Sequence, residues 1–339
     1  MARLLPIDFV QAPTARRPRK VTDAAQDAQQ QAAYREQQRQ QNINRQALRR
    51  VEHLHAQLQS EQPGRRLWLV GDGRFTNGTF LRGLSAEVTF IGRTRGDAKL
   101  CAVPAADAPH PRGGRPRRYG VALPTPEALR QDDGAPWQTV RAYAVGRTHE
   151  FRIKTMGPLR WRCAGDRNLS LLVIAPLGYR LRAGGKLLYR RPAYLLCTDP
   201  TLAPAQVVQA YLWRWDIEVN LRDEKTLLGV GQAQVRQPQA VQHVPATAVA
   251  AYALLLLAAV QAFGPTGQPQ ALPPPAWRRR ETPPRAPTMR LINHLRWELW
   301  GAALEAGGFG GFSSTAPAGE KCEQPAAPAL HSVCYTQAG

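Results

Sequence analysis

The segment RLWLVGDGRFTNGTFLRGLSAEVTFIG, residues 66–92, decides the fold expected for this chain. Residues 67–70 form a short apolar run that is typical of a buried strand, and Asn77 is placed to cap a helix that begins TFLRGL. A second apolar run, residues 88–92, predicts another buried strand. A strand, a helix and a strand in this order indicate a parallel unit and therefore an α/β fold.

Asp72 follows the first of these strands and stands between two glycines. Ligands of parallel sheets gather at the carboxyl ends of the strands, so Asp72 is a candidate metal or substrate ligand. The alternative is an ordinary turn aspartate, because aspartate between glycines is common in turns.

The segment YLWRWDIEVNLRDEK, residues 211–225, predicts a helix with one apolar side. At about 100° per residue, that side carries Ala210, Trp213, Ile217, Leu221 and Leu228. We expect it to pack inward.

A narrow polar line runs beside that apolar side and consists of Tyr211, Arg214, Glu218, Arg222 and Lys225. Spacings of three, four and seven place these residues on one stripe of the helix. Arg214 favours the ionised form of Glu218, which is the form that binds a metal. A solvated face with ordinary i,i+4 ion pairs is the alternative.

The charge balance points to a polyanionic partner. The chain has 339 residues, 45 Lys and Arg against 25 Asp and Glu, and a formal charge of +20. Nucleic acid is the simplest such partner, because neutralised phosphates release counterions. The compositional bias of a GC-rich genome is an alternative source of part of the arginine excess.

Several common sites find no support in the sequence. The five cysteines are odd in number and form no CxxC, so neither a disulfide framework nor a zinc site is expected, and a reducing cytoplasm is the easier assumption. We expect no signal peptide in the first 20 residues. GxxxxGK[ST], GxGxxG after a strand, HExxH and GxSxG are all absent.

Residues 244–263 contain no charge and approach the length that crosses a membrane. Pro245, Thr247 and Gln261 interrupt this run, and alanine dominates over leucine. We expect a buried helix packed within the same domain and no membrane contact. A membrane anchor remains the alternative.

Composition divides the chain into three parts. Residues 1–62 are an extended basic segment followed by a Gln-rich helical region, whose second half is amphipathic. Residues 63–264 form the main α/β domain, with an antiparallel β region inserted at about 149–197. Residues 265–339 hold a Pro/Arg-rich linker, an amphipathic helix and a tail expected to be disordered.

The chain resembles a family of bacterial insertion-sequence transposases of the DDE class. Tyr211, Arg214, Glu218 and Lys225 fit the family signature Y-(2)-R-(3)-E-(6)-K, and VGDGRFTNGTFLRGL with FIGRTRGDAKL is similar to the region of its second catalytic aspartate. The resemblance covers residues 4–304. It implies an RNase H-like (retroviral-integrase-type) catalytic fold with a β insertion before the helix that carries the catalytic glutamate.

The resemblance also implies roles for individual residues. Asp72 and Glu218 would be the second and third catalytic acids and would share Mg²⁺, with Mn²⁺ as an alternative ion. The implied reaction is phosphodiester cleavage and strand transfer of an insertion sequence, on transposon-end and target DNA, by a monomer or a homodimer. The DNA-contacting residues would be Tyr211, Arg214 and Lys225, and Arg222 joins them from the same stripe.

The first catalytic aspartate of the family has only three candidates here, Asp8, Asp23 and Asp27. Asp8 lies on a plausible strand, whereas the other two lie in the polar Gln-rich segment. We therefore expect an N-terminally truncated, inactive copy whose first aspartate is encoded upstream of Met1, which leaves its status as an enzyme open. The alternative is a non-catalytic nucleic-acid-binding protein derived from a transposase.

Overall fold

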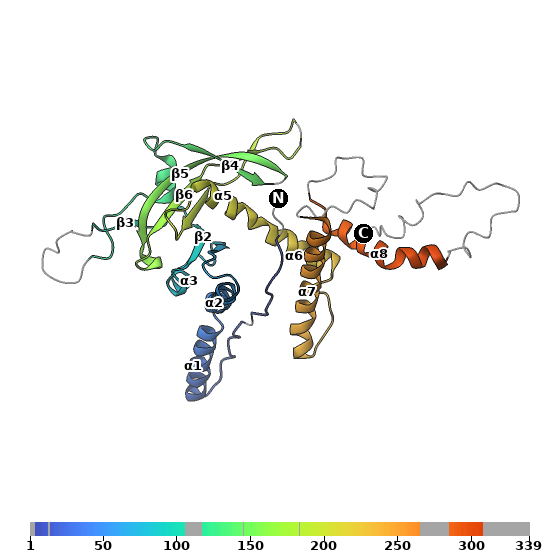
Figure 1. Ribbon diagram of the computed structural model, residues 1–339. Helices are drawn as coiled ribbons and strands as arrows, with labels where there is room; N and C mark the ends of the chain where they lie inside the picture. The colour runs from blue at the N-terminus through green and yellow to red at the C-terminus, as the bar shows by residue number, and fades with distance from the viewer. Residues whose placement is uncertain are drawn as a thin grey trace. The chain divides into compact units, whose positions relative to one another are not determined.

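The computed structural model describes residues 4–12, 14–105, 117–144, 146–182, 184–264 and 285–307 (Figure 1). The chain forms two compact units. The first, the sheet unit, comprises Gln11–Trp215. The second, the helical unit, comprises Met1–Val10 together with Asp216–Gly339. This division differs from the expected boundaries at residues 62 and 264, because it falls inside the segment predicted to be one helix.

Two helices precede the sheet. Helix α1, Ala24–Gln40, buries no residue, and its N-cap Asp23 accepts a hydrogen bond from the Ala25 amide. Helix α2, Ile43–Glu61, is amphipathic and buries Leu48 and Val51. The expected helical region, with an amphipathic second half, is therefore present.

The parallel unit predicted at residues 66–92 is confirmed. Strand β1, Leu67–Gly71, pairs in parallel with β2, Val88–Thr94, and helix α3, Gly78–Gly83, connects them. Asn77 caps α3 by accepting a hydrogen bond from the Phe80 amide at 3.1 Å. The fold class is therefore α/β, with β1 at one edge of the sheet.

The predicted antiparallel region is present between the parallel unit and the later helix, and it belongs to the same sheet as the parallel pair. Strands β1-β2-β9-β6-β5-β3 follow one another in a single mixed sheet, with β4 paired to β5. Because β9 pairs directly with β2, the antiparallel strands continue the parallel pair. The region also begins earlier than residue 149. Its strands are β3 Leu100–Ala102, β4 Gln138–Ala144, β5 Arg147–Trp161, β6 Leu169–Ile174 and β9 Ala193–Cys197.

Two smaller features lie between these strands. Strands β7, Gly178–Tyr179, and β8, Leu188–Tyr189, form a separate two-stranded hairpin. Helix α4, Pro126–Gln131, lies between β3 and β4. Its C-terminal end is held by the buried Lys154 ammonium, which donates to backbone carbonyls there.

The sheet is covered on both faces. One apolar cluster joins α2, α3 and α4 to the sheet, and a second joins it to helix α5, Pro204–Trp213. Val207, Val208 and Ala210 of α5 are buried against strands β2, β4, β5, β6 and β9. The result is a layered α/β arrangement, in which helix α5 packs on the sheet after the last strand.

The helical unit contains helices α6 Trp215–Leu227, α7 Pro238–Phe263 and α8 Thr288–Gly307. The helices expected at 244–263 and 291–304 are thus present, and the linker and tail at 265–284 and 308–339 lie outside the described residues. Segment 4–10 joins this unit, where Leu5 packs against the buried cluster that includes Tyr252 of α7.

Helix α7 is the one described helix long and apolar enough to cross a membrane, and 22% of its most apolar window is buried. Length and composition alone are weak evidence for a membrane span, since core helices meet the same criterion. One face of α7, with Tyr252 and Leu256, is buried, whereas Leu254 is 66% exposed. Contrary to expectation, α7 belongs to the helical unit and not to the unit that holds the sheet.

Candidate active site and nucleic-acid interface

Asp72 stands one residue beyond β1 and is exposed. Its Oδ1 accepts a hydrogen bond from the Arg74 amide at 2.8 Å, and its carbonyl accepts from the Phe75 amide at 3.2 Å and the Thr76 hydroxyl at 3.1 Å. The side chain thus stabilises its own turn, as an ordinary turn aspartate does. The same turn holds the carboxylate at the carboxyl end of the parallel pair, where ligands of such sheets bind.

Two glycines allow this turn to lie close against β2. A Cβ on Gly71 would meet the Phe90 ring at 2.8 Å, and a Cβ on Gly92 would collide with Phe90 and the Thr76 hydroxyl. Gly71 and Gly92 are register partners, so the next residues in line are Asp72 and Arg93. The backbone therefore positions an acid beside a base at this edge.

Helix α5 ends at the same end of the sheet. The Tyr143 amide donates to Gln209 Oε1 at 2.7 Å, and Gln209 Nε2 donates to the Tyr143 carbonyl at 3.0 Å. Tyr143 lies near the carboxyl end of β4, and β4 runs in the direction of β1 because four antiparallel pairings separate β4 from β2. The C-terminal turn of α5 is thereby held at the end of the sheet where Asp72 lies.

That turn carries the first two residues of the signature. Tyr211 is partly buried against the apolar cluster under α5, and the Arg214 guanidinium lies 5.8 Å from the Tyr211 ring centroid. Arginine suits phosphate contacts because its planar guanidinium carries several donors and can also stack on a ring. Asp72 and the pair Tyr211 and Arg214 therefore lie toward the same end of the sheet but at different edges, Asp72 after β1 and the pair near β4.

The predicted single helix is interrupted at Arg214. Helix α5 ends at Trp213 and α6 begins at Trp215, while Arg214 itself keeps right-handed helical angles. The boundary between the two units follows at Trp215 and Asp216. Tyr211 and Arg214 consequently belong to the sheet unit, whereas Glu218 and Lys225 belong to the helical unit, and the convergence of Asp72 with Glu218 remains a prediction.

The expected inward side of this segment is confirmed at Ala210, which is buried, and Leu228 is partly buried against the core of the helical unit, but it is wrong between them. Trp213, Ile217 and Leu221 are 42%, 44% and 41% exposed. Helix α6 instead buries Asp223 and Glu224, and burial raises the pKa of Glu224, with Asp223 adding to the shift. Glu218, Arg222 and Lys225 are exposed and not partly buried.

The physical reason is a different stripe on α6. Asp216 pairs with Arg285 at 2.9 Å, Asn220 accepts from the Tyr252 hydroxyl at 3.2 Å, and Asp223 accepts from the Thr288 hydroxyl at 2.7 Å. The spacings of four and three put these three acceptors on one side of the helix. Polar contacts thus direct that side toward α7 and the start of α8, which turns the apolar side outward.

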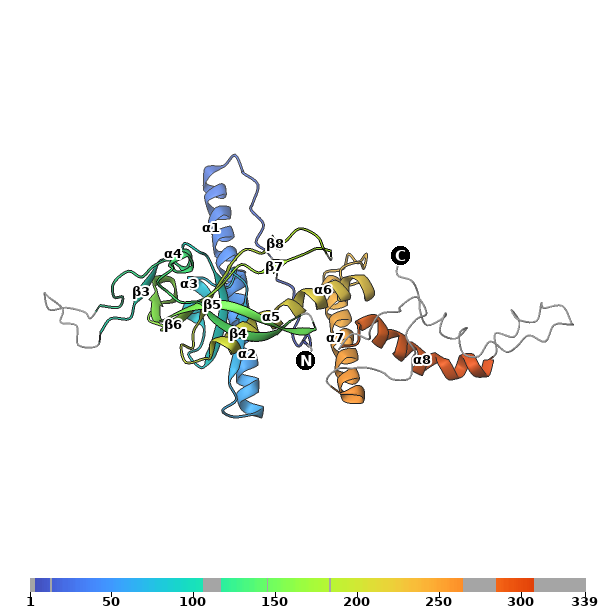
Figure 2. The same cartoon turned by 90° about the horizontal axis from the view of Figure 1, so that it is seen from above.

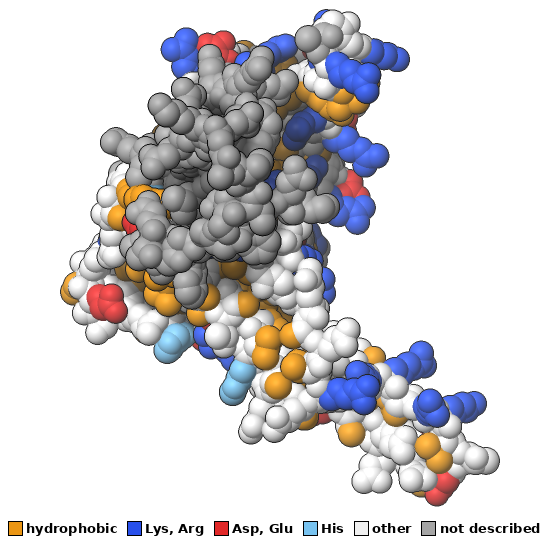
Figure 3. All heavy atoms as spheres, turned by 90° about the vertical axis from the view of Figure 1, so that its right-hand side faces the viewer, with side chains coloured by type: hydrophobic (Ala, Val, Ile, Leu, Met, Phe, Trp, Pro, Cys, Tyr) orange, Lys and Arg blue, Asp and Glu red, His pale blue; other side chains and the backbone are white. Residues whose placement is uncertain are grey.

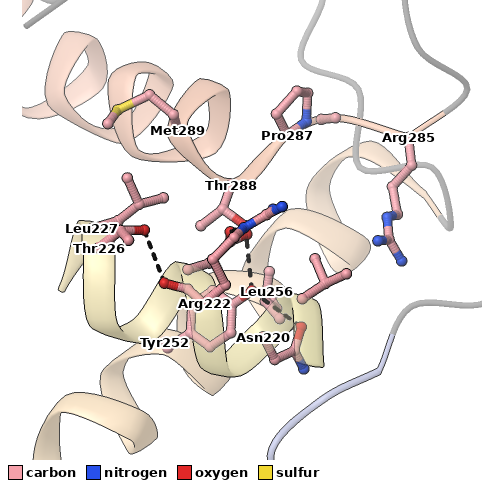
Figure 4. Close-up of a pocket in the computed structure, with 13 residues that line it drawn as sticks. Asn220, Arg222, Thr226, Leu227, Tyr252, Leu256, Arg285, Pro287, Thr288 and Met289 are labelled. Carbon is pink, nitrogen blue, oxygen red and sulfur yellow. Dashed lines mark hydrogen bonds and ion pairs between the residues drawn. The ribbon is translucent and has the colours of Figure 1, made fainter. Parts of the chain in front are cut away.

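This stripe borders a cavity of about 390 Å³ within the helical unit (Figure 4). Asn220, Tyr252 and Thr288 point toward one another in it, and Leu256 forms part of its apolar lining. Arg222 lies at its edge and donates to Asp223 at 2.9 Å. Every polar group in this chain of contacts has a partner, so the cluster is explained as the buried polar connection between α6, α7 and α8.

The candidates for a further catalytic acid lie elsewhere. Segment 4–10, which contains Asp8, forms no strand, contrary to expectation. Asp23 is the N-cap of α1, and Asp27 accepts from the Val21 amide. Asp199 accepts from Thr201 and pairs with Arg66 at the amino end of β1, the end opposite Asp72.

The described residues contain no group of three or more His, Cys, Asp or Glu side chains that could hold a metal ion. Mg²⁺ prefers several oxygen ligands. Asp72 and Glu218 each lie outside any such group among the described residues, so a Mg²⁺ site that used either of them would need further oxygen ligands.

Basic side chains dominate the exposed charges. Lys and Arg are more frequent than Asp and Glu on the face drawn in Figure 3. Sequence reasoning assigned the DNA contacts to Tyr211, Arg214, Arg222 and Lys225 only. It missed the stretch 167–198, which contains six basic residues and no acid, and the absence of acids was the signal that could have revealed it.

No model of a known protein family matches the chain, and no curated protein matches it. The class defined by the structure is therefore a mixed α/β protein with a separate helical unit. The transposase resemblance rests on the sequence signature alone.

Proposed function

We propose that this chain is a DNA-binding protein of the DDE transposase type. Its proposed reaction is Mg²⁺-dependent phosphodiester cleavage and strand transfer, with Mn²⁺ as an alternative ion. An RNase H-like fold for the sheet unit, a cytoplasmic location and a homodimeric state are parts of the same proposal.

One observation carries the proposal. The spaced signature residues begin at the end of α5, and Gln209 holds this end of α5 at the same end of the sheet where Asp72 follows β1. Asp72 at the β1 edge and the end of α5 beside β4 thereby lie toward the same end of the sheet, which is the end where ligands of such sheets bind. A strand-borne acid and the arginines of a helix at one end of a sheet are groups that phosphate chemistry can use.

The proposed roles follow from the chemistry of each side chain. Arg214 contacts a DNA phosphate with the planar guanidinium that stacks on Tyr211, and Lys225 supplies a further cationic contact from α6. Arg222 is a weaker candidate, since it already donates to Asp223. Asp72 and Glu218 are the proposed acids of the reaction, which requires that the two units bring them together.

A second function is non-catalytic nucleic-acid binding on the same scaffold. The observation that favours it is the lack of a metal-holding group among the described residues. Loss of an essential group in such a site costs several kcal/mol, about a thousandfold or more in rate. We therefore expect DNA binding to be strong and cleavage by this chain to be poor.

The test uses the purified full chain with supercoiled plasmid and a labelled duplex. We expect binding that weakens steeply with salt, with a slope of about −0.9 for each phosphate contacted, and only trace nicking with Mg²⁺ or Mn²⁺. Asp72→Asn and Glu218→Gln should remove the trace, whereas Glu52→Gln on the exposed side of α2 should leave it unchanged. Robust nicking that Glu218→Gln abolishes would show a complete active site, and failure to bind DNA would overturn the function altogether.

A further inference from the structure

The β7–β8 hairpin stands out from the sheet as a two-stranded ribbon (Figure 2). Its stem pairs Gly178 with Tyr189 and Tyr179 with Leu188. At its tip, Gly184 has a φ of +74°, and the Gly185 amide donates to the Arg182 carbonyl at 3.0 Å. A glycine tolerates this left-handed angle, so a tight turn is built into the tip.

The charge of this hairpin has one sign. The sequence GYRLRAGGKLLYRR, residues 178–191, contains five basic residues and no acid, and no acid occurs anywhere from 167 to 198. All five basic side chains are exposed, namely those of Arg180, Arg182, Lys186, Arg190 and Arg191. Unbalanced basic charge on one projecting element is the footprint of a polyanion-binding surface.

Apolar and aromatic side chains alternate with these charges. Tyr189 is 66% exposed and Leu181 is 79% exposed. The Arg190 guanidinium lies 5.4 Å from the Tyr179 ring centroid, which presents a stacked cation at the stem. A merely solvated hairpin does not need exposed side chains of this size, whereas a nucleic-acid surface uses them against bases and sugars.

The base of the hairpin opens into a hollow of about 750 Å³ at the carboxyl end of β2. Arg93, Arg95 and Arg191 line it. The acids in it are already engaged, because Asp97 pairs with Arg95, and Glu127 pairs with Arg130 and with Tyr194. Arg93 follows Gly92, the register partner of Gly71, so the basic surface reaches the strand end that carries Asp72.

We propose that the β7–β8 hairpin and the hollow at its base, residues 178–182 and 184–191 with Arg93, bind double-stranded DNA and direct its backbone toward Asp72. A two-stranded ribbon has the width that the DNA major groove admits. The arginines at its base then meet the phosphates beside the groove. This inference rests on the proposed function, because both take DNA as the substrate. It places the duplex on a surface outside residues 211–225.

The experiment compares two variants of the full chain that lose the same charge. One is Arg180→Ala/Arg182→Ala/Arg190→Ala on the hairpin. The matched control is Arg35→Ala/Arg39→Ala/Arg45→Ala, three exposed arginines on α1 and α2. Binding to a duplex of about 30 base pairs is measured from about 50 to 200 mM salt, a range over which phosphate contacts dominate affinity.

We expect the hairpin variant to lose affinity at least about tenfold and its salt slope to fall by about 3, one for each phosphate contact removed. The control variant should change affinity less than about threefold, since it alters only the general charge. Equal losses in the two variants would overturn the hairpin surface while leaving the DNA-binding function intact. If the unmodified chain binds no DNA, both proposals fail together.

A second measurement on the unmodified chain does not depend on the folding of a variant. Lys186 is the one lysine of the hairpin, and Lys20 is an exposed lysine elsewhere in the sheet unit. Bound duplex should protect Lys186, and not Lys20, from acetylation by a small reagent. Unprotected Lys186 would contradict the proposal. The hairpin could instead bind single-stranded DNA or anionic phosphatidylserine vesicles and not the duplex. That result would show that double-stranded DNA is not its ligand.

Discussion

Gln209 on α5 and the backbone of Tyr143 on β4 form a reciprocal hydrogen-bonded pair, with N···O distances of 2.7 and 3.0 Å. This pair satisfies one donor and one acceptor of a strand and fixes the end of α5 against the sheet. The placement of Tyr211 and Arg214 depends on it.

Gln209→Leu should therefore weaken both stability and DNA binding. A partly buried amide and carbonyl would lose their partner, which costs about 1–3 kcal/mol of unfolding free energy. Urea unfolding and duplex affinity measure the two effects. Gln38→Leu, at an exposed site on α1, is the control and should change stability by no more than about 0.5 kcal/mol. Unchanged affinity in a destabilised Gln209→Leu chain would separate α5 from the DNA site.

Gly92→Ala should disturb the turn that carries Asp72. The added Cβ would collide with Phe90 and with the Thr76 hydroxyl, which donates to the Asp72 carbonyl. Overpacking of this kind costs about 1–3 kcal/mol. Gly73→Ala is the matched control, because its nearest contact, the Arg93 carbonyl, is at an ordinary 3.6 Å. Thermal unfolding compares the two, and equal melting temperatures would contradict the packing described for this turn.

Local sequence signals predicted the parallel unit well. Apolar runs at 67–70 and 88–92 and the cap at Asn77 act over a few residues, so their outcome depends little on the rest of the chain. The pairing of β2 with β9 joins residues that are far apart in the sequence, as Ile91 with Cys197 shows. Nothing local specifies that contact, so the sequence predicted an inserted antiparallel region but not its pairing with the parallel unit.

The candidate site was predicted only in part, for a similar reason. The periodicity of residues 211–225 correctly indicated helix, but α6 packs through Asp216, Asn220 and Asp223 and not through Ile217 and Leu221. The groups that select that side are the hydroxyls of Tyr252 and Thr288 and the guanidinium of Arg285. Sequence periodicity assumes an apolar partner and cannot anticipate a polar one.

Thr288→Val tests the polar connection in the helical unit. The Thr288 hydroxyl donates to Asp223 at 2.7 Å, and both residues are 7% exposed. Removing this donor from a buried carboxylate should cost about 1–3 kcal/mol. Hydrogen exchange of α6 and α7 amides should become faster. Thr226→Val, at an exposed helix position where the hydroxyl bonds only the Arg222 carbonyl, should leave exchange nearly unchanged. If hydrogen exchange became faster in Thr226→Val than in Thr288→Val, this connection would be refuted.

Glu127 should make the folding stability of the sheet unit fall at acid pH. Its hydrogen bond from Arg130, followed by that from Tyr194, lowers its pKa from 4.5 to about 2. A carboxyl whose pKa is depressed in the folded state contributes stability above its unfolded value. That contribution is lost as the pH falls from about 4.5 toward 2.

Urea unfolding at a series of pH values should therefore show a loss of stability in that window, and Glu127→Gln should flatten it. Glu150→Gln is the control, because the Glu150–Arg141 pair is largely exposed on the β4–β5 hairpin and contributes little. An unchanged pH profile in Glu127→Gln would show that another group is responsible.

The proposed function requires Asp72 and Glu218 to converge on one metal ion beside bound DNA. Fe²⁺ substituted for Mg²⁺ generates hydroxyl radicals with ascorbate and peroxide, and these cut the polypeptide within a few ångströms of the ion. The account predicts two cuts in the full chain, one near residue 72 and one near residue 218, both suppressed by Glu218→Gln and both by Asp72→Asn. A cut at only one of these positions, or two cuts that respond independently to the two substitutions, would contradict a shared site.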